Sequence, residues 1–267
     1  MRITGKRRLV VDTLKYLLTI GLLVWILGRG TEQLGYRWHW YRVPRYLFTI
    51  KDGQFAAGPL LLGLGVTFQI AGVGLIFAFF IGLITAIFRL SDSFTARMLA
   101  RGYLEAIRNT PLLIQLFFIY FVLAPVIEME AFTAAVLALS LFEGAYTSEI
   151  LRAGILSIQK GQWEAAHSLG MNTAQTYTHI VLPQAIRRIL PPLTSQGVSL
   201  IKDSALVSTV SIYDLTMQGR AVISQTFMTF EIWFTVAAIY LVITISLSTL
   251  VQVMERRMRV GSVGIDH

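Results

Sequence analysis

The sequence contains no cysteine among its 267 residues, and only 14% of them are charged. The first absence excludes disulfide bonds, thiol catalysis and cysteine-based metal sites. The shortage of charge, beside 55% hydrophobic residues, excludes an ordinary soluble domain of this size and places the chain in the membrane class. The motif G-x-x-x-x-G-K-[ST], which binds nucleotide phosphates, is also missing, so the sequence shows no phosphate-binding loop of this kind.

The few histidines do not indicate an enzyme. They are not clustered with carboxylates at the spacing of metal ligands, so we expect no catalytic residue and no metal site. The four are His39, His167, His179 and His267. The net charge of +8 could indicate nucleic-acid binding, but in a membrane chain a basic excess usually gathers in cytoplasmic loops. We therefore expect no nucleic-acid partner.

Long apolar runs account for most of the chain. Each is near or above the roughly 20 residues that a helix needs to cross a bilayer. They cover residues of about 10–28, 58–88, 106–127, 131–156, 191–213 and 231–254. Six crossings would place both termini on the same side of the membrane.

The positions of the basic residues predict which side that is. If the N-terminus is cytoplasmic, fourteen Lys and Arg residues lie in inner segments and six lie outside, which agrees with the positive-inside rule. The outer six are Arg29, Arg37, Arg42, Arg45, Lys51 and Arg220. We therefore expect a multi-pass protein with both termini in the cytoplasm.

The sequence divides into three parts. Residues 1–57 hold the first span and the longest outer loop, residues 58–254 hold the other five spans, and residues 255–267 form a basic tail. The first span could be a secretory signal, but Arg29 follows where a small-residue cleavage site is needed, so we favour an uncleaved anchor. In residues 29–57, aromatics alternate with arginines, which is more typical of an interfacial belt than of a binding site.

Small residues recur every four positions in the second span. Gly74, Ala78 and Gly82 share one helix face, which would let another helix approach closely.

Residues 158–185 are a polar interlude between apolar spans. Residues 160–169 are good helix formers, and Gly170 can take the left-handed conformation that ends a helix. Asn172 or Thr173 can cap a second short helix, which Pro183 should stop from running on. The alternative interpretation is an ordinary amphipathic helix within a loop.

The same interlude resembles the cytoplasmic EAA loop of ABC importer permeases, in which Glu-Ala-Ala is followed at fixed gaps by Gly and Ile-x-Leu-Pro. The resemblance implies that the loop forms coupling helices that press on an ATPase, with Trp163 beside the motif. The matching residues are Glu164, Ala165, Ala166, Gly170, Ile180, Leu182 and Pro183.

Three further segments resemble motifs of the polar amino-acid importers within that group. The segment from Tyr103 to Gln115 carries Glu105, Arg108, Thr110 and Pro111, and residues 145–158 carry Glu149 and Arg152. Near residue 202 the family has Lys-Asp-Thr-Ser, whereas this chain has Lys202, Asp203, Ser204 and Ala205. We expect structural ion pairs between Glu105 and Arg108, between Glu149 and Arg152, and between Lys202 and Asp203.

Glu143 is the most costly residue of the fourth span. It lies twelve residues from the outer end, roughly 18 Å deep, where an ionisable group faces protein or water. Either it faces the substrate path and pairs with a cationic group of an amino acid, or it is a buried carboxylate bonded to a neighbouring helix. Gln69 and Gln115 are weaker substrate-binding candidates, since amides in spans often only bridge helices.

The resemblance as a whole covers residues of about 60 to 250 and identifies the chain as similar to the permease of a polar amino-acid ABC importer. The resemblance implies an all-α polytopic membrane protein with the type I ABC importer fold, about six transmembrane helices and cytoplasmic coupling helices. It also implies a bacterial inner-membrane location, two ABC ATPase subunits that bind ATP and Mg, a second permease subunit, an extracytoplasmic solute-binding protein and an amino-acid substrate.

Two other classes fit parts of the sequence. A proton- or ion-coupled secondary transporter of a small polar solute would also use a mid-membrane carboxylate, but no inverted repeat of broken helices is present and the coupling loop would have no purpose. A six-span signalling or assembly protein would need no ATPase partner.

Overall fold

The computed structural model describes residues 5–33, 35–51 and 54–260. The chain forms two compact units, Met1–Tyr41 and Arg42–His267. The first unit consists mainly of helix α1, Gly5–Gln33, whose apolar stretch Val11–Gly30 is long enough to cross a membrane. The predicted first span is therefore confirmed as an apolar helix. The predicted tail extends into residues 261–267, which lie outside the described residues.

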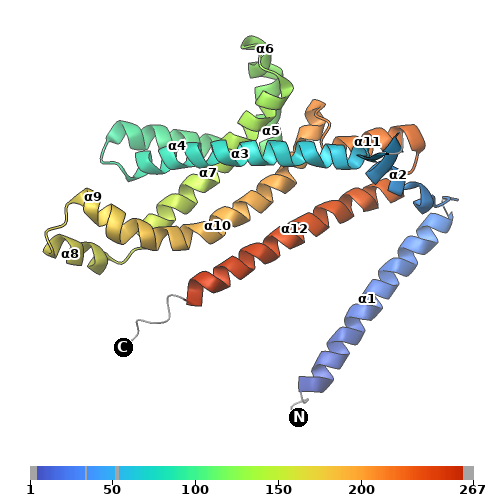
Figure 1. The fold of residues 1–267 in the computed structure, drawn as a ribbon, viewed down its shortest axis with the longest axis horizontal. Helices are drawn as coiled ribbons and strands as arrows, with labels where there is room; N and C mark the ends of the chain where they lie inside the picture. Colours follow the sequence, from blue (N-terminus) through green and yellow to red (C-terminus); the bar gives the residue numbers. More distant parts are fainter. Residues whose placement is uncertain (1–4, 34, 52–53, 261–267) are drawn as a thin grey trace. The chain divides into compact units, whose positions relative to one another are not determined.

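The second unit is helical apart from one small hairpin, as Figure 1 shows. Its long helices are α3, Pro59–Leu90, α7, Ala131–Leu156, α10, Leu182–Asp203, and α12, Thr229–Val260. Its shorter helices are α2, Pro44–Leu47, α4, Phe94–Arg108, α5, Leu112–Phe117, α6, Ala124–Val126, α8, Lys160–Ser168, α9, Thr173–Thr176, and α11, Leu215–Thr226. The remaining turns are the 3-10 segments Trp40–Arg42 and Ser204–Val210 and the π segments Phe118–Leu123 and Tyr177–Val181.

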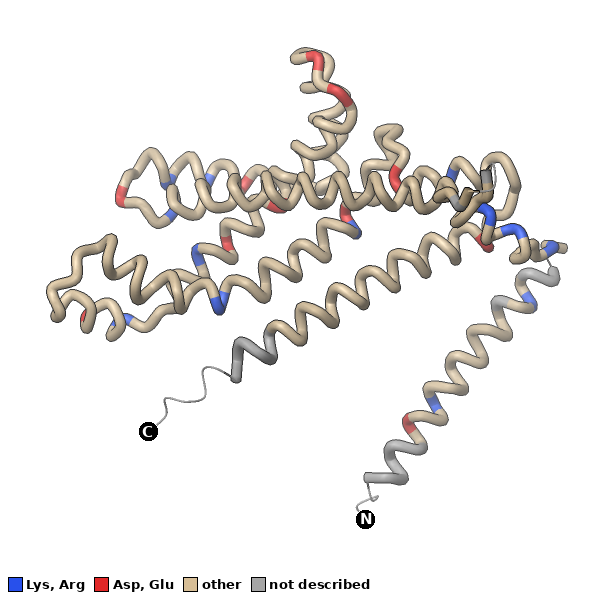
Figure 2. The backbone as a smooth tube through the Cα atoms, viewed as in Figure 1, with Lys and Arg blue, Asp and Glu red and all other residues tan. Residues whose placement is uncertain are grey.

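The membrane-length helices agree with most of the predicted spans. Among the described residues, four helices are long and apolar enough to cross, and a fifth span arises if α4 and the α5–α6 segment count as one. Charged residues are sparse along α3 and α12 in Figure 2. Because at most five spans are found among the described residues, six crossings stay a prediction.

Two predicted spans have different boundaries from those expected. The span predicted at 106–127 begins inside α4, and the chain bends by 104° between α4 and Leu112–Val126. The bend lies at Pro111, which is the N-cap of α5 and has an extended backbone conformation. A proline inside a helix would remove a backbone hydrogen bond and clash with the preceding turn, so the chain bends here instead. The span predicted at 191–213 is not continuous, since α10 already ends at Asp203.

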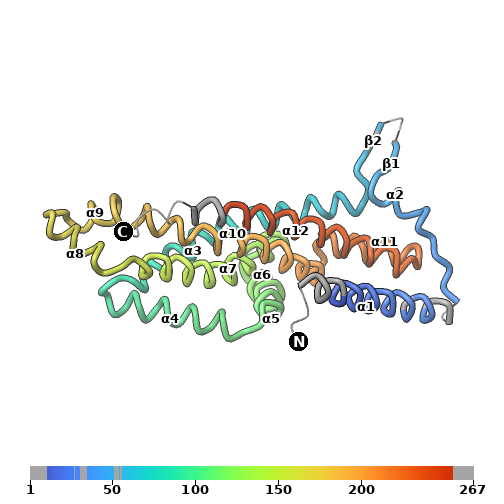
Figure 3. The backbone as a smooth tube through the Cα atoms, turned by 90° about the horizontal axis from the view of Figure 1, so that it is seen from below, coloured from blue at the N-terminus to red at the C-terminus, as the bar shows by residue number. Residues whose placement is uncertain are grey.

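The hairpin was not predicted, although the sequence contained a signal for it. Strands β1, Phe48–Lys51, and β2, Gln54–Ala57, pair antiparallel with Lys51 opposite Gln54, so two residues connect them. Those two are Asp-Gly, a dipeptide that favours two-residue hairpin turns. The hairpin projects from the helices in Figure 3.

Helix α7 is the central helix of the second unit. The predicted small-residue face of α3, with Gly74, Ala78 and Gly82, is buried. A Cβ added at Gly82 would lie 2.6 Å from the side chain of Thr147 on α7, and one at Gly144 would lie 2.8 Å from Ile81 on α3. The two helices therefore approach closely at these glycines, as expected.

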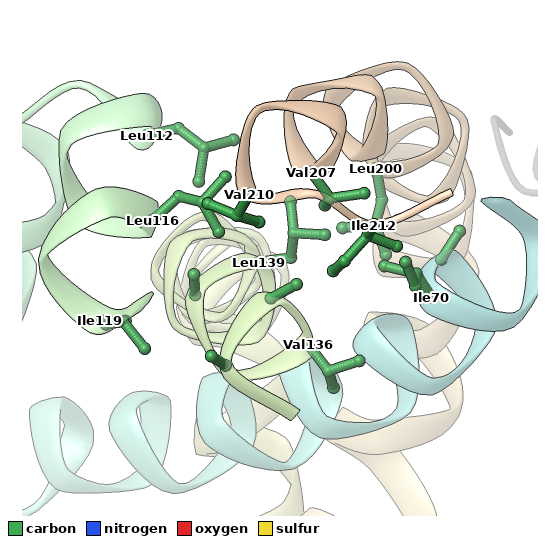
Figure 4. Close-up of a cluster of buried hydrophobic side chains, with 14 of the residues drawn as sticks. Ile70, Leu112, Leu116, Ile119, Val136, Leu139, Leu200, Val207, Val210 and Ile212 are labelled. Carbon is green, nitrogen blue, oxygen red and sulfur yellow. The ribbon is translucent and has the colours of Figure 1, made fainter. Parts of the chain in front are cut away.

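Three apolar clusters hold the helices together. The largest joins α3, α5, α7 and the end of α10, with Ile70, Leu116, Leu139 and Leu200 almost fully buried, as Figure 4 shows. A second cluster lies at the α11 end around Leu60, Leu215, Met228 and Ile232. The third joins α7 and α10 to the segment that contains α8 and α9.

Candidate functional site

The predicted coupling segment folds as two short helices around a glycine turn. Helix α8 ends after Ser168, and Gly170 adopts a φ of 74°, the left-handed conformation expected of it. Asn172 caps α9 by accepting a hydrogen bond from the backbone N–H of Gln175, whose side chain accepts one in return from the Asn172 N–H. This capping box satisfies two backbone donors that would otherwise lack partners, so the turn is locally determined.

The expectation that Pro183 ends the second helix is wrong. The chain stays helical from α9 through a π-helical stretch at Tyr177–Val181 into α10. Pro183 is the second residue of α10 and directly follows the π-helical stretch, where the regular α-helical hydrogen-bond pattern is already interrupted. Pro191 and Pro192 lie inside α10, where the burial of Ile189 against α7 helps to stabilise the helix.

The coupling segment is attached to the ends of α7 and α10. Trp163 of α8 packs edge-on against Tyr177, with ring centroids 5.2 Å apart, and Ala166 is buried. The amide of Gln184 on α10 donates to Gln162 Oε1 on α8 at 3.3 Å. Figure 1 shows α8 and α9 at the opposite end of this unit from α11.

A further contact fixes α10 to the end of α7. Arg188 donates to the backbone oxygen of Ser157 at 2.5 Å and to its hydroxyl at 3.0 Å. Close by, a Cβ at Gly154 would lie 2.2 Å from the Ile189 side chain, so only glycine allows this approach. The coupling segment, the end of α7 and the start of α10 therefore form one packed body.

The motif residues of this body are divided between a buried and an exposed face. Ile180 is half-buried, and the others that matched the family pattern point outward except Ala166. The exposed ones are Glu164, Ala165, Gly170, Leu182 and Pro183. Leu169 is 81% exposed at the end of α8, which is typical of an apolar side chain that a partner covers.

A charged cluster lies between α3, α4 and α7, centred on Glu149. Its carboxylate pairs with Arg152 at 3.1 Å, which confirms that predicted pair, and also with Arg108 at 3.2 Å and with Arg89. The predicted Glu105–Arg108 pair is not formed among the described residues, where Arg108 pairs with Glu149 instead. Glu105 accepts a hydrogen bond from the Asn109 amide at 2.8 Å.

Glu143 lies in the interior of α7 with no exposed surface. Its Oε2 accepts a hydrogen bond from the Gln196 amide of α10, and the Asp203 carboxyl at the end of α10 lies nearby. Glu143 Oε1 has no hydrogen-bond partner among the described residues.

The predicted Lys202–Asp203 ion pair is not formed among the described residues. Adjacent residues on a helix point about 100° apart, and Asp203 faces Glu143 while Lys202 is exposed. Sequence reasoning thus missed the partner that Asp203 has on α7.

The two glutamine candidates lie in different settings. Gln115 donates from Nε2 to the backbone oxygens of Ile107, at 2.7 Å, and of Thr110, at 3.0 Å, so it holds the bend between α4 and α5. Gln69 is exposed on α3. Sequence reasoning overlooked Gln196, although an amide within the predicted fifth span was a visible signal. It also did not predict that Arg89 pairs with Glu149.

The family model described as "Binding-protein-dependent transport system inner membrane component" matches residues 56–260. The glutamine transport system permease protein of Escherichia coli (strain K12) is 39% identical over 206 residues, which cover 76% of this chain and 94% of the relative. The L-cystine transport system permease protein of Bacillus subtilis (strain 168) is 38% identical over 198 residues, covering 73% and 85%.

Solved structures give the same result. The crystal structure of an amino acid ABC transporter with histidines matches with a TM-score of 0.71 and 39% identity, covering 74% of this chain and 94% of that one. An inward-facing structure of the MetNI methionine ABC transporter matches with a TM-score of 0.56 at 19% identity, which supports the fold alone.

The Glu149 cluster predicts a stability effect. Replacing Glu149→Gln leaves three arginines facing a neutral amide, and we expect a loss of about 1–3 kcal/mol, between the values for exposed and buried pairs. Thermal unfolding of the purified protein in detergent measures this loss. Glu105→Gln is the control, because among the described residues this carboxylate accepts a hydrogen bond from Asn109 alone, and it should unfold within about 0.5 kcal/mol of the parent protein. Equal melting of both variants would contradict the assigned role of Glu149.

Proposed function

The chain belongs to the family of binding-protein-dependent transport system inner membrane components. We propose that its helices α7 and α10 transmit conformational changes of an ATPase subunit to the path that an amino acid takes through the membrane. The chain is a permease subunit of an ATP-driven amino-acid importer with the type I ABC importer fold. The matched relatives are ABC permeases, so the secondary-transporter alternative is not supported, and neither is a signalling protein.

One observation carries the proposal. Helices α7 and α10 meet at two levels, through the Glu143–Gln196 contact in their interiors and through Arg188 and Ser157 at the end that bears α8 and α9. Glu143 lies thirteen residues before Leu156, the end of α7, which corresponds to roughly 20 Å along the helix axis. A force on the coupling segment would therefore reach the Glu143 level through two packed helices.

The proposed machine has several chains. The exposed face around Glu164 and Leu169 would seat an ATPase, two copies of which would bind ATP and Mg outside this chain. A second permease subunit, identical or homologous, would complete the path, and an extracytoplasmic solute-binding protein would deliver the amino acid. The basic-residue bias supports a bacterial inner-membrane orientation with both termini in the cytoplasm.

For the substrate, we propose that Glu143 accepts a cationic group of the amino acid. In the described conformation the Gln196 amide occupies Oε2, so the substrate's ammonium or basic side chain would replace it when α7 and α10 separate. Glutamine and cystine, which the relatives' names give as their cargo, both carry an α-ammonium group. Gln69 and Gln115 remain weaker candidates, Gln115 because its amide already holds a bend.

The substrate proposal is tested by Glu143→Gln in the full complex reconstituted into liposomes. The amide keeps the size of the side chain and its contact with Gln196 but removes the charge, so ATP-driven uptake should fall at least about tenfold. Assembly and basal ATPase activity should stay unchanged. Glu105→Gln serves as a carboxylate control outside the proposed path. Unchanged uptake by Glu143→Gln would discard the role of Glu143, with the importer assignment left standing.

The coupling proposal is tested at Gly170. A β-branched residue is strongly disfavoured at a φ of 74°, so Gly170→Val should displace the turn between α8 and α9. We expect uptake to be lost, with ATP hydrolysis uncoupled or the ATPase released, while the spans stay folded. Gly161→Val is the control, because Gly161 lies in α8 with open space around its Cβ position. Full uptake by Gly170→Val would show that this loop is not the coupling element.

A further inference from the structure

The charged cluster around Glu149 borders a polar cavity of about 350 Å³. Its walls come from α4, from α7 and from the end of α3. The charged side chains that line it are those of Arg89, Arg101, Arg108, Glu105 and Glu149. Asn109 and Tyr146 complete its polar lining, and the Arg108 guanidinium lies 5.9 Å from the centre of the Tyr146 ring.

The charges of this cavity leave positive charge without a protein partner. Glu149 is already paired with Arg89 and Arg108, and also with Arg152, which is not among the residues that line the cavity. The side chain of Arg101 makes no hydrogen bond or ion pair within the described ranges, and it is exposed to the cavity. Since arginine has five donors in a planar fork, an oxyanion is the ligand that suits Arg101 best.

A second, mostly apolar hollow of about 360 Å³ adjoins the first. The two share Arg101 and Glu105, and the second is also lined by Phe94, Arg97, Met98 and Gly102. These two apolar side chains are 74% and 64% exposed, as is much of Leu99 beside them. A charged compartment next to an exposed apolar one matches a molecule with an anionic head and a hydrocarbon chain.

The cavity lies toward one end of the membrane-length helices α3 and α7. Arg89 is the penultimate residue of α3, and Glu149 is seven residues, roughly 10 Å, from the end of α7. The positive-inside rule assigns this end to the cytoplasmic leaflet, where basic pockets between helices bind anionic headgroups.

We propose that this cavity binds the phosphate of an anionic phospholipid of the inner leaflet, with Arg101 as its principal ligand and Phe94 and Met98 against an acyl chain. The inference rests on the proposed orientation but not on the role of Glu143 or of the coupling loop. A bound headgroup would connect α4 to the end of α7, next to the coupling body, so the lipid composition of the membrane would influence transport.

The test measures retained lipid by native mass spectrometry of the full permease–ATPase complex, extracted from vesicles with equal amounts of phosphatidylglycerol and phosphatidylcholine. We expect phosphatidylglycerol to be retained preferentially, and Arg101→Gln to lower its retention about fivefold. Arg101→Lys, which keeps the charge, should restore most of it. Arg187→Gln is the matched control, since it removes one exposed charge of α10 outside the cavity and should retain lipid like the parent complex.

Three outcomes would overturn the proposal. Equal retention by Arg101→Gln and Arg187→Gln would show that any lipid preference is general surface electrostatics. Displacement of the lipid by millimolar phosphate would identify a free-anion site, and Arg101-dependent binding of an amino acid without lipid would identify a solute site. Thermal unfolding of each complex checks that lost retention does not reflect lost folding. Normal uptake by Arg101→Gln in neutral vesicles would leave the transport assignment intact while the lipid result decides the site.

Discussion

Helix α7 lies against both α3 and α10 only because glycine stands at the points of closest approach. Side chains at Gly82, Gly144 or Gly154 would overlap atoms of the facing helix. In a membrane, lipid is as apolar as the helix surfaces, so close backbone packing and buried polar contacts must supply the attraction that water supplies elsewhere. The chain has no disulfide to replace them. Everything that α7 carries, from Glu143 to the coupling segment, is positioned by this packing.

The polar groups of α7 serve two levels of the molecule. Near its middle, Glu143 bonds to Gln196 of α10, and a buried pair of this kind gives the two helices a fixed register. Near its end, Glu149 gathers arginines from α3, α4 and α7 itself, so one carboxylate ties three helices together. The coupling segment follows directly, packed on the ends of α7 and α10. A permease needs such a connection, because the energy of ATP is released in another chain.

Local features of this structure were predictable from sequence, whereas side-chain partners between helices were not. The glycine turn at Gly170 and the Asn172 cap depend on a few neighbouring residues, and the spans depend on hydropathy, so both were found. The partner of Arg108 depends on how α4 approaches α7, and the same holds for Asp203 and Glu143. Pro183 was predicted to end a helix because the packing that keeps this segment helical is not local. The hairpin had a local signal that was overlooked, an Asp-Gly dipeptide that follows residues with high β-strand propensity.

The central claim, that α8 and α10 move as one body, can be tested directly because the chain has no cysteine of its own. Gln162→Cys and Gln184→Cys would place two thiols on facing positions of α8 and α10, where the glutamine amides meet at 3.3 Å. The measurement is ATP-driven uptake by the reconstituted complex before and after a short bis-methanethiosulfonate reagent bridges the two thiols. The account predicts full uptake in the cross-linked complex. Loss of uptake on bridging, reversed by a reductant, would show that α8 must move against α10 and would contradict it.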